Sequence, residues 1–284
     1  MQDERPSRTA MRVAMRRAAH QLIDAPKVLD DPIGVAIIGP EAVAKLAGTN
    51  RKRDRFARTA RAFMVVRSRF AEDELARAVR RGVAQYVVLG AGLDTFAYRN
   101  PYAEAALRVF EVDHPATQAW KRRKLAAAGI AIPASVTFAP IDFERDTLDE
   151  GLRRVGFDRR APAFFSWLGV TMYLTDEAFA STLAFMASTP PAGGLAFDYA
   201  VPRSSLGLMG RLAHDALARR VARAGEPFRA YFDPGALHRR LEQAGFTAID
   251  DLGRDEMNDR YFRDRADGLR VSGDLARLLG AERR

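Results

Sequence analysis

The sequence contains no cysteine. This absence excludes disulfide bonds, thiolate metal ligands and a cysteine nucleophile, and it fits a reducing compartment. Long apolar runs are also missing: the longest, residues 161–174, falls short of the roughly 20 residues that a membrane helix needs. The chain is charged from Asp3 onward and no apolar run follows, so we expect no signal peptide and a cytoplasmic location.

Repeats, low-complexity linkers and metal-binding clusters are absent as well. The four histidines form no set with acidic residues at ligand spacing, so we expect no metal site. The net charge of +9 comes mainly from dispersed arginines, whereas a nucleic-acid binder concentrates its charge on one face and interleaves aromatic residues. We therefore expect no nucleic-acid or membrane partner. We also expect a surface that favours acidic substrates, and we leave a homo-oligomer open.

What is present is an ordinary globular composition, with 48% apolar and 29% charged residues in a chain of 284. This length is compatible with a single domain. We expect an N-terminal helical segment, a cofactor-binding core, a helical cap that folds over the sheet with the N-terminal helices, and a C-terminal part of the sheet. Their ranges are 1–80, 85–200, 201–232 and 233–284.

Hydrophobic patterning predicts strands that alternate with helices after residue 80. Short β-branched or aromatic runs predict strands over 85–89, 107–112, 135–139, 163–167, 195–199, 246–251 and, as a last one, 269–272. Helical spacing predicts helices over 9–23, 58–80, 115–128, 147–155, 176–188, 202–225 and 233–244. This alternation predicts an α/β fold with a doubly wound, mostly parallel, seven-stranded sheet.

A glycine-rich turn, L-G-A-G-L-D-T, follows the first predicted strand. Ligands of open α/β sheets bind beyond the carboxyl ends of the strands, so we expect a ligand here. Gly90 lets the chain turn sharply, and Gly92 lets the backbone approach a ligand. Asp94 can cap the next helix or accept a hydrogen bond from a ligand ammonium group. A tight turn without a ligand would also explain the two glycines.

Asp113 ends the second predicted strand, 21 residues after Gly92. An acidic residue at that distance can bind both hydroxyls of a ribose. It could also cap the helix that begins at Pro115, and the two roles are compatible.

Two cofactors with a ribose remain, a nicotinamide dinucleotide and S-adenosylmethionine. A dinucleotide site usually has a third glycine where the helix begins, so that the pyrophosphate can approach the helix N-terminus. Thr95 occupies that position here. A ligand without phosphates needs no such glycine, which favours S-adenosylmethionine.

Two further segments follow later predicted strands. Asp142 can accept a hydrogen bond from an adenine amino group while the ring of Phe143 packs on the base, although Asp142 could equally cap a helix. In the segment that follows the fourth strand, Trp167, Thr171 and Tyr173 are the residues we expect to face a ligand.

These motifs, in this order, resemble the leucine carboxyl methyltransferase family. More narrowly, they resemble its bacterial branch of S-adenosylmethionine-dependent O-methyltransferases, which includes enzymes of polyketide tailoring. The resemblance covers residues 10–255 and rests on four segments. They are Q-Y-V-V-L-G-A-G-L-D-T-F-A-Y-R at 85–99, F-E-V-D-H-P-A-T-Q-A-W-K at 110–121, D-F at 142–143 and W-L-G-V-T-M-Y-L-T at 167–175.

The resemblance implies a Rossmann-like class I methyltransferase fold and a role for each matching residue. Arg67 would hold the methionyl carboxylate, Gly90 would lie against the methionyl part, Asp113 would bind the ribose, and Asp142 with Phe143 would hold the adenine. The full set of predicted cofactor-binding residues is Arg67, Gly90, Ala91, Gly92, Asp94, Asp113, His114, Asp142, Phe143 and Trp167.

One departure from the family pattern bears on the methyl acceptor. Family members commonly have a glutamate just before the G-V-T-M-Y stretch, where this chain has Leu168. Contacts of that glutamate cannot be transferred, which favours a small molecule over a protein C-terminus. A carboxylate acceptor needs no base, whereas a hydroxyl benefits from one, and Tyr173 and His214 are the weak candidates. A nicotinamide oxidoreductase and a non-catalytic regulator remain the alternatives.

Overall fold

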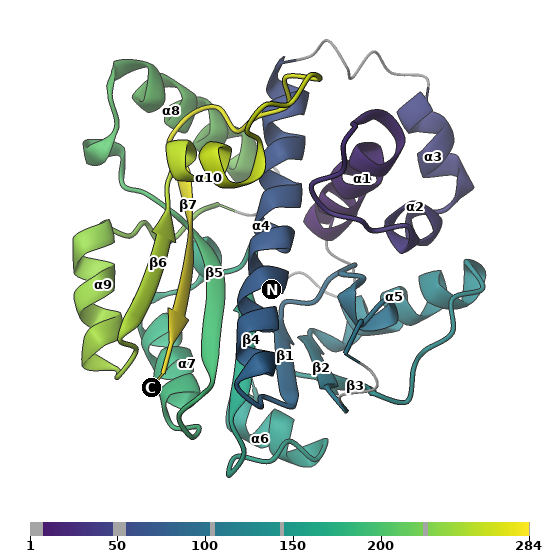
Figure 1. Cartoon of the computed structure of the whole chain (residues 1–284), viewed down its shortest axis with the longest axis vertical. Coiled ribbons are helices and arrows are strands. Elements are labelled where there is room, and N and C mark those ends of the chain that lie inside the picture. The colour runs from purple at the N-terminus through teal and green to yellow at the C-terminus, as the bar shows by residue number, and fades with distance from the viewer. Residues whose placement is uncertain (1–7, 48–54, 103–105, 143–144, 224–226, 284) are drawn as a thin grey trace.

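The computed structural model describes residues 8–47, 55–102, 106–142, 145–223 and 227–283 (Figure 1). Its strands form one seven-stranded sheet in the order β3-β2-β1-β4-β5-β7-β6. The strands are β1 (Gln85–Leu89), β2 (Arg108–Asp113), β3 (Val136–Pro140), β4 (Ala163–Trp167), β5 (Gly194–Ala200), β6 (Ala248–Leu252) and β7 (Ala276–Glu282).

Strands β1 to β5 pair in parallel, and β7 runs antiparallel to both of its neighbours, β5 and β6. The predicted doubly wound, mostly parallel sheet is therefore confirmed. The predicted last strand is wrong, because residues 269–272 are not in a strand. Gly280 interrupts the apolar pattern of the real last strand, and a Cβ there would lie 2.7 Å from Cδ of Glu74 on the helix packed against it.

Two short helices, α2 and α3, fall within the predicted N-terminal helical segment but outside the predicted helix ranges, and a further helix, α10, was not predicted from the sequence pattern. Its sequence, R-D-E-M-N-D-R-Y, buries only Met257 and so has no apolar period. The α-helices are α1 (Arg8–Ile23), α2 (Ile33–Ile38), α3 (Pro40–Ala47), α4 (Arg55–Arg80), α5 (Pro115–Ala127), α6 (Leu148–Arg154), α7 (Asp176–Ala187), α8 (Leu208–Arg223), α9 (Pro234–Gln243) and α10 (Arg254–Tyr261). Short 3-10 turns are η1 (Phe96–Tyr98), η2 (Thr171–Tyr173) and η3 (Arg203–Ser205).

Alternation along the strands sends side chains to two separate cores. In β1, Val87 and Leu89 pack in the core with α6, α7 and α9, whereas Tyr86 and Val88 pack in the core with α4 and α10. This is the period of two that places successive side chains on opposite faces of a sheet. Because both faces are covered, β1 is buried throughout, which explains its unbroken apolar sequence.

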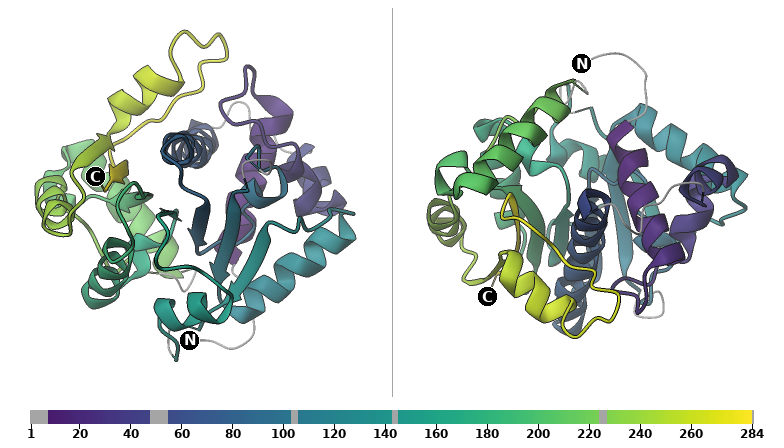
Figure 2. Two further views of the ribbon diagram at one scale, coloured as in Figure 1. Left: turned by 60° about the horizontal axis from the view of Figure 1, so that its bottom comes forward. Right: turned by 90° about the horizontal axis from the view of Figure 1, so that it is seen from above.

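The N-terminal helices lie at the edge of the sheet where the parallel strands end (Figures 1 and 2). The buried His20 on α1 ties them to α4. Its Nδ1 lies 2.9 Å from Asp24, whose carboxylate receives two hydrogen bonds from Arg61, at 2.6 and 2.9 Å. Its Nε2 accepts the backbone N–H of Val28 at 3.0 Å, so Nδ1 carries the proton and donates to Asp24.

No helix in the described ranges combines the length and the apolar character needed to cross a membrane.

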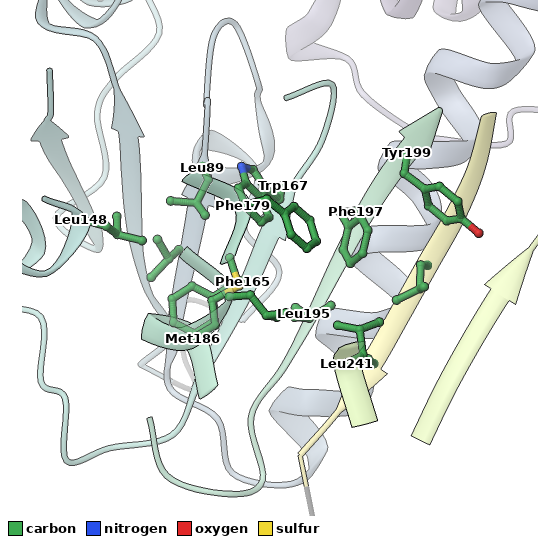
Figure 3. Packing of buried hydrophobic residues seen from close by; sticks show 14 of the residues in the cluster. Leu89, Leu148, Phe165, Trp167, Phe179, Met186, Leu195, Phe197, Tyr199 and Leu241 are labelled. Atoms are coloured by element: carbon green, nitrogen blue, oxygen red, sulfur yellow. The ribbon is translucent and has the colours of Figure 1, made fainter. Parts of the chain in front are cut away.

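Aromatic rings fill the core beneath α7 (Figure 3). The Trp167 ring at the end of β4 stacks on Phe179 of α7, with centroids 5.2 Å apart and planes 8° apart. Phe179 also packs against Phe197 and Phe232, at 6.0 and 4.8 Å. Phe179 is completely buried, so it connects the helix with two strands and the chain that follows α8.

We expect Phe179→Ala to lower the free energy of unfolding by about 3–5 kcal/mol, because it leaves a cavity among three aromatic rings. Urea unfolding followed by circular dichroism measures this change. Leu208→Ala, at a side chain that is 75% exposed, is the control and should change stability by less than about 0.5 kcal/mol. Equal stability of the two variants would contradict the role given to Phe179.

Candidate functional site

A cavity of about 530 Å³ opens where β1 and β4 end, between α1 and the segment after α8. Viewed from this end of the sheet, α1 and α8 lie on opposite sides of α4 (Figure 2). The cavity wall is formed by Thr9, Ala10, Val13, Ala14, Arg17, Arg67, Ser68, Val88, Leu89, Gly90, Ala91, Gly92, Leu93, Asp94, Asp113, Ser166, Leu168, Gly169, Val170, Tyr173, Pro227 and Arg229.

The turn from Gly90 to Gly92 forms one side of this cavity. Both glycines have positive φ, +67° and +44°, which L side chains rarely adopt. A Cβ on Gly90 would lie 2.4 Å from Cγ2 of Val170, and one on Gly92 would lie 3.1 Å from Cβ of Ala10 on α1. The glycines are thus required by the backbone and by close neighbours on both sides.

Asp113 lies at the tip of β2 and is bound to this turn. Its carboxylate accepts hydrogen bonds from the backbone N–H groups of Gly92, at 2.6 Å, and of His114, at 2.7 Å. The cap of α5 is instead His114, whose Nδ1 accepts the N–H of Ala116 at 3.2 Å. An ionised carboxylate has about four acceptor positions, so Asp113 keeps capacity for two ribose hydroxyls. Burial raises its pKa, although the two N–H groups oppose the change.

Asp94 connects the turn with the N-terminal helix. Its carboxylate accepts the N–H of Phe96 at 2.9 Å and pairs with Arg17 of α1 at 3.1 Å. Burial would raise the pKa of Asp94, but the positive charges of Arg17 and Lys121 outweigh it and hold the pKa below its ordinary value. Asp94 therefore stays ionised at the mouth of the turn, as an ammonium ligand requires.

Thr95, at the position of a dinucleotide site's third glycine, has a structural role. Its buried hydroxyl donates to Asp31 at 2.7 Å and accepts from Arg17 at 3.2 Å. The glycine that would let a pyrophosphate approach a helix is thus replaced by part of a buried polar network.

Arg67 reaches the cavity from α4 and is paired with a carboxylate that the sequence reasoning missed. Its Nη1 lies 3.1 Å from Oδ2 of Asp198 on β5, and Oδ1 of Asp198 accepts the backbone N–H of Gly169 at 2.5 Å. Asp198 is fully buried. A single acid within the strand sequence G-L-A-F-D-Y-A was the signal that could have found it, because buried acids require a partner.

Nε of Arg67 is buried and has no hydrogen-bond partner among the described residues. A buried guanidinium donor is rarely left without an acceptor, so this atom fits a bound anionic group such as the methionyl carboxylate. The residues at the turn and Arg67 together suit the cofactor predicted from the sequence.

Of the residues predicted to contact the cofactor, Asp142 and Trp167 are not part of the cavity wall. Asp142 follows β3 and its backbone N–H bonds to Asp146 at 3.3 Å, whereas Phe143 lies outside the described residues. The Trp167 ring is buried in the core against Phe179. Their contacts with a cofactor stay predictions.

The two weak catalytic candidates differ in their position relative to the cavity. Tyr173 lines the cavity, and its ring meets that of Phe228 edge to face at 5.5 Å. His214 lies on α8, outside the cavity wall, with its ring 5.1 Å from that of Tyr231 and its Nδ1 3.3 Å from Asp215. No group of three metal-ligating side chains occurs within the described part of the chain.

Comparison with known protein families identifies the family to which this chain belongs. The family model of leucine carboxyl methyltransferase matches residues 10–187, which include α1, Arg67, the glycine turn, Asp113 and η2. The chain belongs to the leucine carboxyl methyltransferase family. The resemblance to this family that the sequence showed is confirmed.

Curated relatives are named as methyltransferases that depend on S-adenosyl-L-methionine. A protein of Bacillus subtilis (strain 168), named as the S-adenosyl-L-methionine-dependent methyltransferase YktD, is 38% identical over 72% of this chain and 67% of its own length. A Mycobacterium marinum protein named as a methyltransferase with the same cofactor is 34% identical over 67% of this chain and 65% of its own. The chain thus spans about two thirds of the length of these relatives.

Solved structures show the same fold at low sequence identity. A structure described as a methyltransferase from Thermobifida fusca YX aligns with a TM-score of 0.59 and 16% identity, covering 99% of this chain and 96% of that one. A DUF574 family protein from Streptomyces avermitilis aligns with a TM-score of 0.54 and 15% identity, covering 95% and 97%.

The cofactor predicted from the sequence, S-adenosylmethionine, is confirmed by the family and by these relatives. Methyl transfer from it is the activity that they support, and the nicotinamide alternative is not supported.

We expect Arg67→Ala and Asp113→Asn each to weaken binding of S-adenosylhomocysteine by about 2 kcal/mol, or about thirtyfold, because each removes a charged hydrogen bond to the ligand. Isothermal titration calorimetry measures the affinities. Asp255→Asn, at a carboxylate that is 74% exposed on α10, serves as the control. Wild-type affinity in both site variants would refute the assignment.

The raised pKa of Asp113 also predicts how cofactor binding depends on pH. As the pH falls toward that pKa, the carboxyl takes up a proton and loses acceptor capacity, so affinity for S-adenosylhomocysteine should begin to fall at a higher pH than an aspartate of ordinary pKa would give. Asp94, whose pKa is lowered, remains ionised there. Calorimetry at several pH values should show a steeper loss in the wild type than in Asp113→Asn. Parallel curves would count against Asp113.

Proposed function

We propose that this protein transfers the methyl group of S-adenosylmethionine to an oxygen atom of a small molecule. The observation that carries the proposal is the way α1 and the segment after α8 cover the carboxyl end of the sheet. Together they leave a cavity of about 530 Å³ whose wall includes both the glycine turn and Tyr173. Such a volume fits a cofactor and a small acceptor better than a folded protein partner.

S-adenosylmethionine supplies a methyl group that its positive sulfonium already activates. The chain's own residues therefore mainly position the reactants and exclude water. Asp113 and the turn hold one end of the cofactor, and Arg67 holds the other through its carboxylate. Leu168 and Val170 contribute apolar wall beside the turn.

An oxygen acceptor is either a carboxylate, which is ionised at neutral pH, or a hydroxyl, which must lose a proton. Leu168 stands in the cavity wall where relatives commonly have a glutamate, so no side-chain base is available at that position. The two candidates for a base are Tyr173, which lines the cavity, and His214, which lies outside its wall with Nδ1 3.3 Å from Asp215. The proposal thus covers small carboxylic acids and, with one of these residues as base, small hydroxyl compounds.

We expect the purified protein to move tritiated methyl from S-adenosylmethionine onto small carboxylic acids or phenols, because the covered cavity admits small acceptors. A panel should also contain amines and peptides with free C-termini. Treatment of the product with alkali separates the oxygen acceptors, since methyl esters release volatile methanol and methyl ethers do not.

Transfer to amines alone, or to peptide C-termini alone, would refute the proposal. Arg67→Ala should lose activity on every acceptor of the panel at a fixed cofactor concentration, which provides the control for background labelling.

A further inference from the structure

The cavity wall contains three arginines, and two of them are already paired within the protein. Arg17 contacts Asp94 at 3.1 Å and donates to the carbonyl of Leu93 at 2.8 Å. Arg67 is paired with Asp198 at 3.1 Å. The guanidinium of Arg229 has neither a hydrogen-bond nor an ion-pair partner within the ranges that the structure describes.

Arg229 is held in place by its backbone. Its N–H donates to the carbonyl of Met172 at 2.7 Å, and the next N–H, of Ala230, donates to the same carbonyl at 3.1 Å. Met172 is the central residue of η2, and its neighbour Tyr173 also lines the cavity. The exposed side chain of Arg229 thus extends from a backbone anchored to η2, at the side of the cavity that Tyr173 also lines.

The acids of the cavity wall lie at the other side. They are Asp94 and Asp113, and both belong to the glycine turn and the strand end next to it. Each already receives hydrogen bonds from the backbone there, and Asp94 also has Arg17. No carboxylate of the wall is thus left to neutralise Arg229 within the described chain.

We infer that Arg229 binds a negatively charged group of the methyl acceptor and so selects small acids, preferably with a planar ring that packs on Tyr173. The inference rests on the proposed function, which gives the turn and Arg67 to the cofactor and leaves this part of the cavity to the acceptor. A guanidinium suits carboxylate, sulfonate and phosphate oxygens because its N–H groups can donate two parallel bonds. The sulfonium of the cofactor adds a second positive charge in the same cavity.

The inference is tested by comparing the binding of an anion with that of a neutral molecule of the same shape. Benzoate and benzamide are titrated by NMR into protein saturated with S-adenosylhomocysteine. The proteins are the wild type, Arg229→Gln, Arg229→Lys and, as the matched control, Arg239→Gln. Arg239 is an exposed arginine on α9 outside the cavity wall.

We expect the wild type and Arg239→Gln to bind benzoate about tenfold more tightly than benzamide. Arg229→Gln should abolish this preference, and Arg229→Lys should retain part of it, because a lysine keeps the charge but loses the paired donors. All four proteins should bind S-adenosylhomocysteine with equal affinity, which shows that the fold and the cofactor site are intact.

Equal affinity of the wild type for benzoate and benzamide, or a benzoate preference that survives Arg229→Gln, would overturn the inference and leave the proposed function standing. Failure of the wild type to bind S-adenosylhomocysteine would instead refute the proposed function, and the inference with it.

Discussion

The hydrogen bond from the N–H of Gly92 to the carboxylate of Asp113, 2.6 Å long, joins the two features on which the site depends. It attaches the glycine turn to the tip of the neighbouring strand. At Gly90 and Gly92 this turn requires residues without a side chain. The parallel pairing of β1 with β2 brings the two partners together. It places Leu89 beside Val112, so the residues that follow each strand lie at the same edge of the sheet. The sheet therefore brings the two parts of the site together.

The N-terminal helices add a second constraint on this turn. Arg17 of α1 contacts Asp31, Asp94, Thr95 and the Leu93 carbonyl, and it is almost fully buried. Buried charges stabilise a structure only when they are completely paired, and removing one partner is costly. Such an arrangement favours one position of α1 over the turn. The same helix supplies part of the cavity wall, so the covering of the cofactor site and the folding of the N-terminal segment depend on the same contacts.

The sequence predicted most accurately what depends on local pattern. The bounds of β1 and β4 agree with the structure to the residue, since a buried parallel strand shows a short apolar run ended by a turn. Long-range partners could not be predicted in this way. The pair formed by Arg67 and Asp198 joins residues 131 positions apart, and nothing in either neighbourhood indicates the other. The cap of α5 shows a smaller failure, because the sequence analysis named Asp113 as a cap, whereas the structure uses Nδ1 of His114.

The resemblance to the family predicts a glutamate where this chain has Leu168. The effect of this difference depends on the charges around the position. Leu168 lies next to Gly169, whose N–H is bound by Asp198, and Asp198 in turn holds Arg67. Asp198 is buried, and each of its carboxylate oxygens already accepts a hydrogen bond. A glutamate at position 168 would add a carboxylate to the cavity wall, which also contains Arg229. With leucine there, the acids of the wall are Asp94 and Asp113, and the side that contains Tyr173 and Arg229 has a cation but no acid. Under the proposed function, that balance would draw an anionic acceptor toward a positively charged methyl donor, as methyl transfer to an ionised oxygen requires.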